Sequence, residues 1–136
     1  MEPMSEDNPD RGPPSPHARS EARGPHKKTY TMVVLTNPVP GREQEYNDWY
    51  DNRHIPDVLA VPGFVGAQRF NLVVNPGGGE PQWRYYATYQ METDDPKGAI
   101  ADVLGRWCTE RMPNSDSLDQ ALFFGVYEAI TPFVSK

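Results

Sequence analysis

The sequence predicts an α+β domain of the ferredoxin-like type, in which a four-stranded antiparallel sheet carries helices on one face. Two observations lead to this fold class. Short segments rich in β-branched and aromatic residues alternate with two segments of helical periodicity, in the order β-α-β-β-α-β. The chain also has 136 residues, a length that suits one domain with one hydrophobic core.

The four expected strands are bounded by turn sequences rich in proline, glycine and asparagine. They are expected at residues 30–36, 64–74, 82–91 and 121–130. The second and third strands form a hairpin across the flexible sequence NPGGGEP. Alternation along the third strand places Tyr85 and Tyr89 on one face and Tyr86 on the other. The sequence leaves open which of these two faces meets the helices.

The first helix is expected after the first strand, because large residues recur there at helical spacing. The residues at positions i, i+3, i+4 and i+7 are Tyr46, Trp49, Tyr50 and Arg53. Pro56 lacks a backbone N–H group and disfavours helical geometry at the residue before it. We therefore expect this helix to break near His54 and to restart as a short turn.

The second helix is expected from Pro96 to about Met112, with Asp94 or Asp95 as its N-terminal cap. One apolar stripe faces the sheet and comprises Ile100, Val103, Leu104 and Trp107. Cys108, the single cysteine of the chain, falls within this helical pattern, so we interpret it as a buried structural thiol. A single cysteine excludes an internal disulfide.

The expected strands carry bulky apolar residues on both of their faces. The neighbouring pairs that show this are Val33 and Val34, Tyr85 and Tyr86, and Phe123 and Phe124. A sheet with one face in water would alternate apolar and polar residues instead. We therefore expect the face without helices to be buried against a second copy of the chain, in a homodimer.

Residues 1–28 differ in composition from the domain expected at residues 29–136. They contain six prolines and no valine, isoleucine, leucine or aromatic residue, so we expect a disordered tail. The tail has equal numbers of acidic and basic residues, which assigns the net charge of −6 to the domain and argues against nucleic acid binding. With no secretory signal and no apolar segment of about 20 residues, we expect a cytoplasmic protein that does not span a membrane.

Residues 45–70, EYNDWYDNRHIPDVLAVPGFVGAQRF, resemble the signature region of the dimeric α/β-barrel superfamily, nearest to its EthD-like branch. Those relatives share the pattern W-Y-x-x-x-H-x-P followed by V-P-G-F. The first part stands here as Trp49, Tyr50, His54 and Pro56. By order of elements the resemblance extends over residues 30–133. It implies a homodimer whose two sheets pack face to face, with a pocket in each subunit between the sheet and its own helices.

The resemblance also implies a pocket histidine that acts together with a tyrosine. His54 matches the motif histidine, and an imidazole titrates near neutral pH, so it is the candidate general base. The alternative is a histidine that caps the broken helix through hydrogen bonds. Tyr50 precedes it by four residues and can face the same cavity. Tyr50, Tyr85 and Tyr89 are the candidates for polarising a substrate oxygen, although each is also a candidate core residue.

Three further side chains are candidates for substrate binding. Trp49 and Trp107 provide aromatic surface, with core packing as the alternative for both. Arg69 lies in a strand of apolar residues, where a charge needs a counter-ion. Its partner is either a structural carboxylate, from Glu92 or Glu128, or a carboxylate of the substrate.

These residues lead us to expect a cofactor-independent lyase, cyclase or isomerase that acts on a small hydrophobic carbonyl or phenolic molecule. The alternatives are a cofactor-free monooxygenase of an aromatic substrate and a non-catalytic small-molecule-binding protein. We expect no metal site, because one domain histidine and scattered carboxylates lack clustered ligands. A single histidine suffices to ligate haem, but the resemblance to haem-handling relatives is the weaker one.

Overall fold

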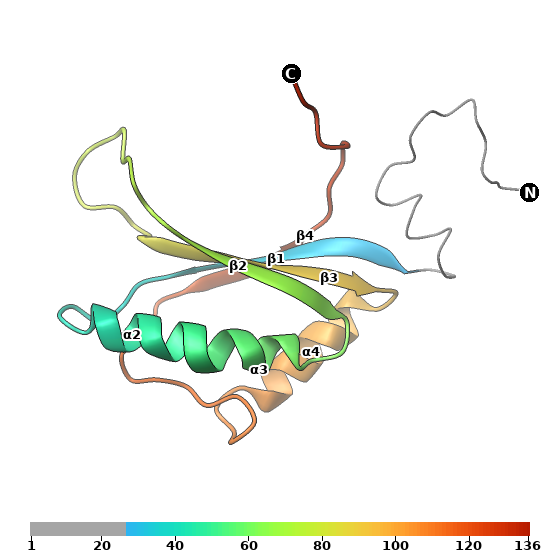
Figure 1. Ribbon diagram of the computed structural model, residues 1–136, viewed down its shortest axis with the longest axis horizontal. Helices are drawn as coiled ribbons and strands as arrows, with labels where there is room; N and C mark the ends of the chain where they lie inside the picture. The colour runs from blue at the N-terminus through green and yellow to red at the C-terminus, as the bar shows by residue number, and fades with distance from the viewer. Residues whose placement is uncertain (1–26) are drawn as a thin grey trace, which may run out of the picture.

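One antiparallel sheet forms the upper layer of the protein in Figure 1, and the helices lie beneath it. The computed structural model describes residues 27–136, so the predicted tail lies outside the described residues except for its last two. The strands are β1 (Lys28–Thr36), β2 (Phe64–Asn71), β3 (Tyr85–Thr93) and β4 (Phe123–Tyr127). Their order across the sheet is β2-β3-β1-β4, with antiparallel neighbours throughout. The ferredoxin-like fold class is confirmed.

The first helical segment stays continuous past Pro56, which corrects the predicted break. It comprises α2 (Glu43–Trp49), a π-helical turn η2 (Tyr50–His54) and α3 (Ile55–Leu59). The Ile55 N–H group donates to the carbonyl oxygen of Tyr50, five residues earlier, and Ile55 keeps helical angles of φ −57° and ψ −52°. The chain therefore accommodates the proline by widening one turn, as π-turns inside α-helices do.

The second helix, α4 (Pro96–Arg106), begins as predicted and ends earlier. The Asp95 side chain accepts a hydrogen bond of 2.9 Å from the Gly98 N–H group, which is a typical N-terminal cap. At the other end Cys108 has a φ of +69°, which a right-handed helix cannot contain. Cys108 is exposed in the turn that follows the helix, so its interpretation as a buried thiol was wrong.

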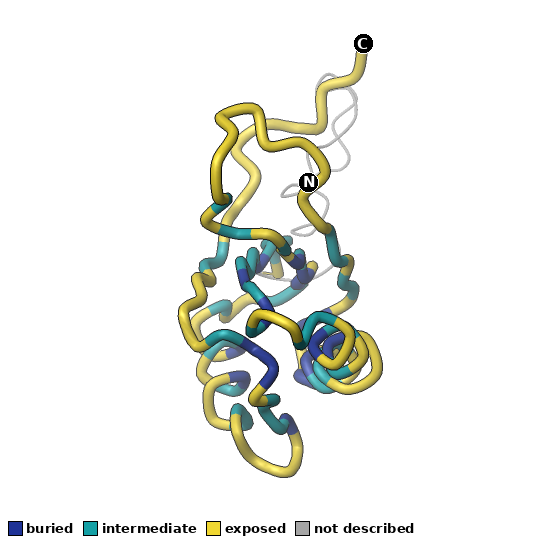
Figure 2. Tube along the Cα trace, turned by 90° about the vertical axis from the view of Figure 1, so that its left-hand side faces the viewer, coloured by how far each residue is buried: buried dark blue, intermediate teal, exposed yellow. Residues whose placement is uncertain are grey.

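Strands β2 and β4 are shorter than predicted, because their apolar ends extend beyond the paired part of the sheet, whereas β3 is displaced from the predicted 82–91 to Tyr85–Thr93. Val73 and Val74 follow β2 and have 85% and 68% of their surface exposed. Ile130, which follows β4, is 95% exposed. Figure 2 shows these ends as exposed segments that rise from the sheet on the side away from the helices.

The alternation of side chains along the strands separates a buried face from an open one. The face toward the helices carries the core residues Met32, Ala87, Tyr89 and Met91, all nearly inaccessible. This answers the question left open by the sequence, because Tyr85 and Tyr89 face the helices and Tyr86 does not. On the open face the rings of Phe70 and Tyr86 stack at 4.5 Å, and Tyr86 is still 40% exposed.

Candidate functional site

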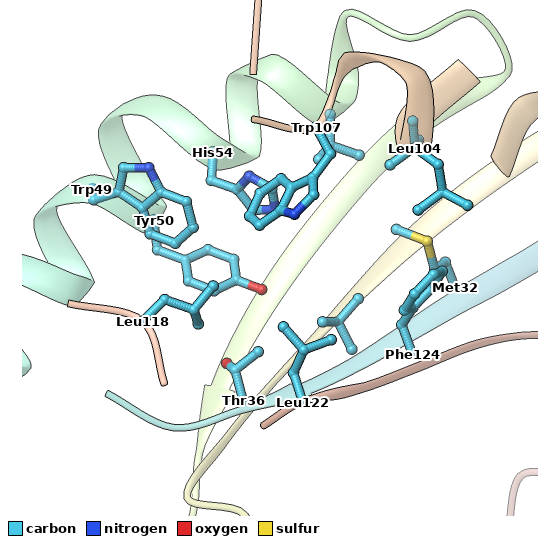
Figure 3. A pocket seen from close by; sticks show the side chains of 13 residues that line it. Met32, Thr36, Trp49, Tyr50, His54, Leu104, Trp107, Leu118, Leu122 and Phe124 are labelled. Atoms are coloured by element: carbon cyan, nitrogen blue, oxygen red, sulfur yellow. The ribbon is translucent and has the colours of Figure 1, made fainter. Parts of the chain in front are cut away.

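A cavity of about 100 Å³ lies between the sheet and the helices. One wall consists of the rings of Trp49, Tyr50, His54 and Trp107 (Figure 3). The remaining wall is apolar apart from Thr36, and includes Met32, Val34, Leu104, Leu118, Leu122 and Phe124. Cavities near this size hold a molecule with a single six-membered ring, as an apolar cavity of about 150 Å³ holds benzene. The shape and lining therefore suit one small aromatic group.

The π-turn η2 places the side chain of His54 among three aromatic rings. Its imidazole stacks on the ring of Trp49, with centroids 4.8 Å apart and planes 19° apart. The rings of Tyr50 and Trp107 meet it edge-on at 5.1 Å and 5.4 Å. The Nδ1 atom is buried and has no hydrogen-bond partner among the described residues. A buried polar atom without a partner is uncommon, and a bound ligand is one explanation for it.

Burial also makes the imidazole neutral under ordinary conditions. Loss of solvent lowers the pKa of His54 to about 4, because an apolar setting disfavours the charged form. The negative charge of Asp57 opposes this effect, and the positive charge of Arg69 adds to it. His54 therefore faces the cavity as a proton acceptor at neutral pH, without a counter-ion of its own in the cavity.

Tyr50 is the second polar group at the cavity, and its pKa moves in the opposite direction. Burial is the main cause that raises the pKa of this phenol to about 12. Figure 3 shows its hydroxyl directed into the space between the two walls. A phenol that keeps its proton at neutral pH is a hydrogen-bond donor. The cavity thus combines the neutral acceptor of His54 with the neutral donor of Tyr50, beside the Thr36 hydroxyl.

Behind Tyr50 lies a layer of polar groups, of which Thr36 also lines the cavity. The Tyr89 hydroxyl is buried without a well-formed hydrogen bond within residues 27–136, although the nearby Tyr50 hydroxyl influences its pKa. Burial raises the pKa of Tyr89 well above 10. The Tyr46 hydroxyl pairs with the Thr36 hydroxyl at 2.5 Å. These contacts hold the ring of Tyr50 from the side of the sheet.

Arg69 belongs to this outer layer as well. Its guanidinium group donates to Asp51 at 2.7 Å and to Asn47 at 2.8 Å. It also lies over the ring of Tyr50, 4.3 Å from the centroid. The carboxylate partner is therefore on helix η2, and neither Glu92 nor Glu128 is the acid that pairs with it. Its position supports a structural role, since it does not line the cavity.

The structure brings together four of the seven residues proposed from the sequence. Trp49, Tyr50, His54 and Trp107 line the cavity, whereas Tyr85, Tyr89 and Arg69 do not. The geometry therefore gives no support to Tyr85 as a catalytic group. The apolar wall was not anticipated, because its members come from β1, α4, β4 and the loop before β4. Their alternation along the strands was the one signal in the sequence that could have identified some of them.

Comparisons with solved structures show similarity in fold. The haem-degrading protein MhuD of Mycobacterium tuberculosis, solved with two haems in its active site, has a TM-score of 0.53 at 16% identity, covering 77% of this chain and 99% of MhuD. A candidate monooxygenase from Shewanella loihica has a TM-score of 0.50 at 15% identity, covering 77% and 97% of the two chains. The resemblance to the dimeric α/β-barrel proteins is thus confirmed as a likeness of fold.

An EthD-family protein from Bacillus halodurans is also similar, with a TM-score of 0.46 at 17% identity over 75% of this chain and 99% of that protein. No protein-family model and no curated protein matches the sequence. Within residues 27–136, no helix is long and apolar enough to cross a membrane. The same residues contain no group of three or more histidine, cysteine or acidic side chains that could hold a metal ion.

Haem does not fit the His54 cavity as the structure shows it. A volume of about 100 Å³ is suited to one ring, whereas a porphyrin has four linked pyrrole rings. The carboxylates of haem would also need cationic partners, and no lysine or arginine lines this cavity. The chemistry of the cavity is therefore derived from the protein side chains alone.

Proposed function

We propose that the protein is an enzyme that removes a proton from a small, neutral, aromatic carbonyl or phenolic molecule. His54 is the general base, and the Tyr50 hydroxyl donates a hydrogen bond to the substrate oxygen. The observation that carries this proposal is that the imidazole of His54 lines a cavity whose wall contains no charged side chain. A neutral substrate is expected, because an ionised one would be desolvated there without a counter-ion.

The low pKa of His54 is compatible with this role once a substrate is bound. Proton transfer from a C–H or O–H group gives an imidazolium next to an enolate or phenolate. The two opposite charges attract each other strongly in an apolar cavity, which raises the pKa of the imidazole in the complex. Tyr50 stabilises the oxyanion from the other side. Return of the proton to another atom gives isomerisation, and departure of a leaving group gives elimination. Attack of the enolate carbon on a second carbonyl of the same molecule gives cyclisation, in which the imidazolium returns its proton to the new alkoxide.

The test is to compare turnover in the wild type and in two His54 variants, with pools of aromatic ketones, polyketide-like compounds and simple phenols as substrates. His54→Phe keeps a ring against Trp49 and removes the base, and His54→Ala removes both. We expect both variants to lose turnover by about 10²- to 10⁴-fold, the usual contribution of a general base. Circular dichroism and a thermal melt show whether each variant folds. A folded His54→Phe variant with full turnover would refute the proposal.

A non-catalytic binding protein is the second candidate, and the low pKa of His54 favours it, because a weak base is a poor proton acceptor. In that case the compounds quench tryptophan fluorescence in titrations but remain chemically unchanged. A cofactor-free monooxygenase would begin with the same proton transfer. It is distinguished by oxygen consumption that matches product formation and by loss of turnover under argon.

We also propose that the working form is a homodimer assembled through the open face of the sheet. Exposed aromatic side chains on that face support it, with Phe123 and Tyr86 at 40% and Tyr127 at 52% exposure. The segment after β4 adds Ile130 and Phe133, at 95% and 93% exposure, on the same side of the sheet. Large apolar side chains exposed together on one face are typical of protein interfaces.

A further inference from the structure

The apolar wall of the His54 cavity continues into a second hollow. Leu104 lines the cavity and also a hollow of about 490 Å³ between α4 and the strands β1 and β4. We call this hollow the α4 groove, and its apolar residues are Tyr30, Pro96, Ile100, Ala101, Leu104 and Val126. Leu104 therefore lies between two apolar spaces, and 54% of its surface is exposed.

The far end of the α4 groove is polar. Lys97 and Glu128 line it there, and Glu128 lies 4.0 Å from Lys28. From Leu104 to Lys97 the helix rises about 10 Å, at 1.5 Å per residue over seven residues. An extended chain advances about 1.1 Å per bond, as a β-strand does over its three backbone bonds per residue. The groove therefore has room for a chain of about nine bonds before it reaches charged groups.

We propose that the substrate of this protein is elongated, with one ring in the His54 cavity and an apolar chain that passes Leu104 into the α4 groove. This inference rests on the proposed function, since it takes the ring site as given. The cavity is filled by a single ring, so any substituent has to leave it. Of the surfaces that adjoin the cavity, the α4 groove is apolar and shares a lining residue with it. The chain would be unbranched or lightly branched, and its end would reach water near Lys97.

The experiment is a titration with phenyl alkyl ketones whose chains lengthen from methyl to octyl, followed by quenching of tryptophan fluorescence. Trp49 and Trp107 both line the ring site, so they report its occupancy. Each methylene that becomes buried strengthens binding by up to about fourfold. We expect affinity to rise steadily along the whole series, because the octyl chain is still shorter than the chain of about nine bonds that the groove accommodates.

Two phenylalanine substitutions on α4 form a matched pair of controls. Ala101 lines the groove, so Ala101→Phe should abolish the gain from chain length and leave the affinity of the methyl ketone within about twofold. Gly105 lines neither space, and a Cβ atom added there meets no other atom within 4 Å. Gly105→Phe should therefore keep the full gain, which separates binding in the groove from general hydrophobic adsorption.

The possible outcomes separate this inference from the function on which it rests. If the methyl ketone binds and longer chains bind no better, the α4 groove is not a substrate site, and the proposed function stands. A gain from chain length that survives Ala101→Phe would also overturn the inference. If no member of the series binds, both the ring site and the groove are refuted.

Discussion

The hydroxyl groups of Tyr50 and Tyr89 are neighbours with different surroundings, and this difference can be tested. The first faces the cavity and the second does not. Tyr50→Phe removes the donor to the substrate oxygen, so we expect kcat to fall by about 10²-fold or more. Tyr89→Phe should change kcat by less than about twofold. Steady-state kinetics of the two variants, each with one hydroxyl removed, measure the contrast. An equal loss in both would assign the effect to packing.

Tyr89→Phe has a further expected effect, on stability. Its hydroxyl is buried without a well-formed hydrogen bond to any described residue. Removing an unsatisfied buried group is neutral or stabilising. We therefore expect the free energy of unfolding of this variant to equal or exceed that of the wild type in urea titrations. A marked loss would show that the hydroxyl has a partner, for example a bound water.

The pKa of His54 gives a stability that depends on pH. Above its unfolded value of about 6.5 the imidazole is neutral in both states, so it has no effect. Because burial lowers the folded pKa to about 4, the unfolded chain alone binds the proton between these values, and stability falls as pH falls. Relative to His54→Phe, the loss should approach about 1.4 kcal/mol per pH unit. Urea titrations at pH 7, 6 and 5 measure it, and equal losses in both proteins would contradict the assignment.

The residues proposed from the sequence that line the cavity lie on or just beyond helices. Helical spacing relates Trp49 to Tyr50 and His54 without knowledge of the rest of the chain. The proposed tyrosines of β3 lie outside the cavity. Alternation along the sequence shows which residues of a strand share a face, but it does not show which other segments pack against that face. Leu118 and Leu122 lie in the loop before β4, where no periodic pattern marks them. Their part in the cavity depends on tertiary packing.

At the scale of elements, the turn after α4 holds a testable strain. Cys108 has a φ of +69°, and this left-handed conformation costs a residue other than glycine about 1 to 2 kcal/mol of folding free energy. Cys108→Gly relieves that strain, while Cys108→Ala keeps it and removes the same thiol. After the entropic cost of glycine, we expect the Gly variant to be more stable than the Ala variant by about 1 kcal/mol in urea titrations. Equal stability would mean that the turn relaxes in the Ala variant.

The two misjudged helix ends have different physical causes. Pro56 forbids one backbone hydrogen bond, and the sequence shows that restriction but not how the chain responds to it. A break in the helix and a widened turn are both compatible with the missing hydrogen bond. In the structure the turn is widened, and Tyr50 and Val58 both pack in the core. At Trp107 the apolar spacing continues while the helix does not. The spacing of apolar residues indicates which of them face the core. It does not determine whether the backbone at each of them is helical.

The whole molecule offers a test of assembly. Tyr86 lies on the open face of the sheet, whereas Leu59 lies on the helical layer, and their exposures are 40% and 37%. Tyr86→Arg places a charge in the proposed interface, which would be costly to bury there. We expect it to give monomers in sedimentation velocity, while Leu59→Arg stays dimeric. Dissociation of the Leu59 variant instead would place the interface on the helices.

The order and pairing of the elements were predictable because each follows from a local pattern. The hydrophobic periods identify two helical segments and four strands, and short turns then leave few ways to connect them. The open face of the sheet was also visible in the sequence, as strands without clean alternation. The size of the cavity was not, because it depends on how side chains from distant segments fill a shared space.

The π-turn of Tyr50–His54 is in effect a single inserted residue. An insertion in an ordinary helix would rotate everything beyond it by about 100° and spoil the apolar face. Here the widened turn absorbs the extra residue, so Tyr46 before it and Val58 after it both remain in the core. The helix would be complete with one residue fewer. The surplus residue lies in the turn that carries His54, so the imidazole reaches the cavity while the helix on both sides stays packed against the sheet.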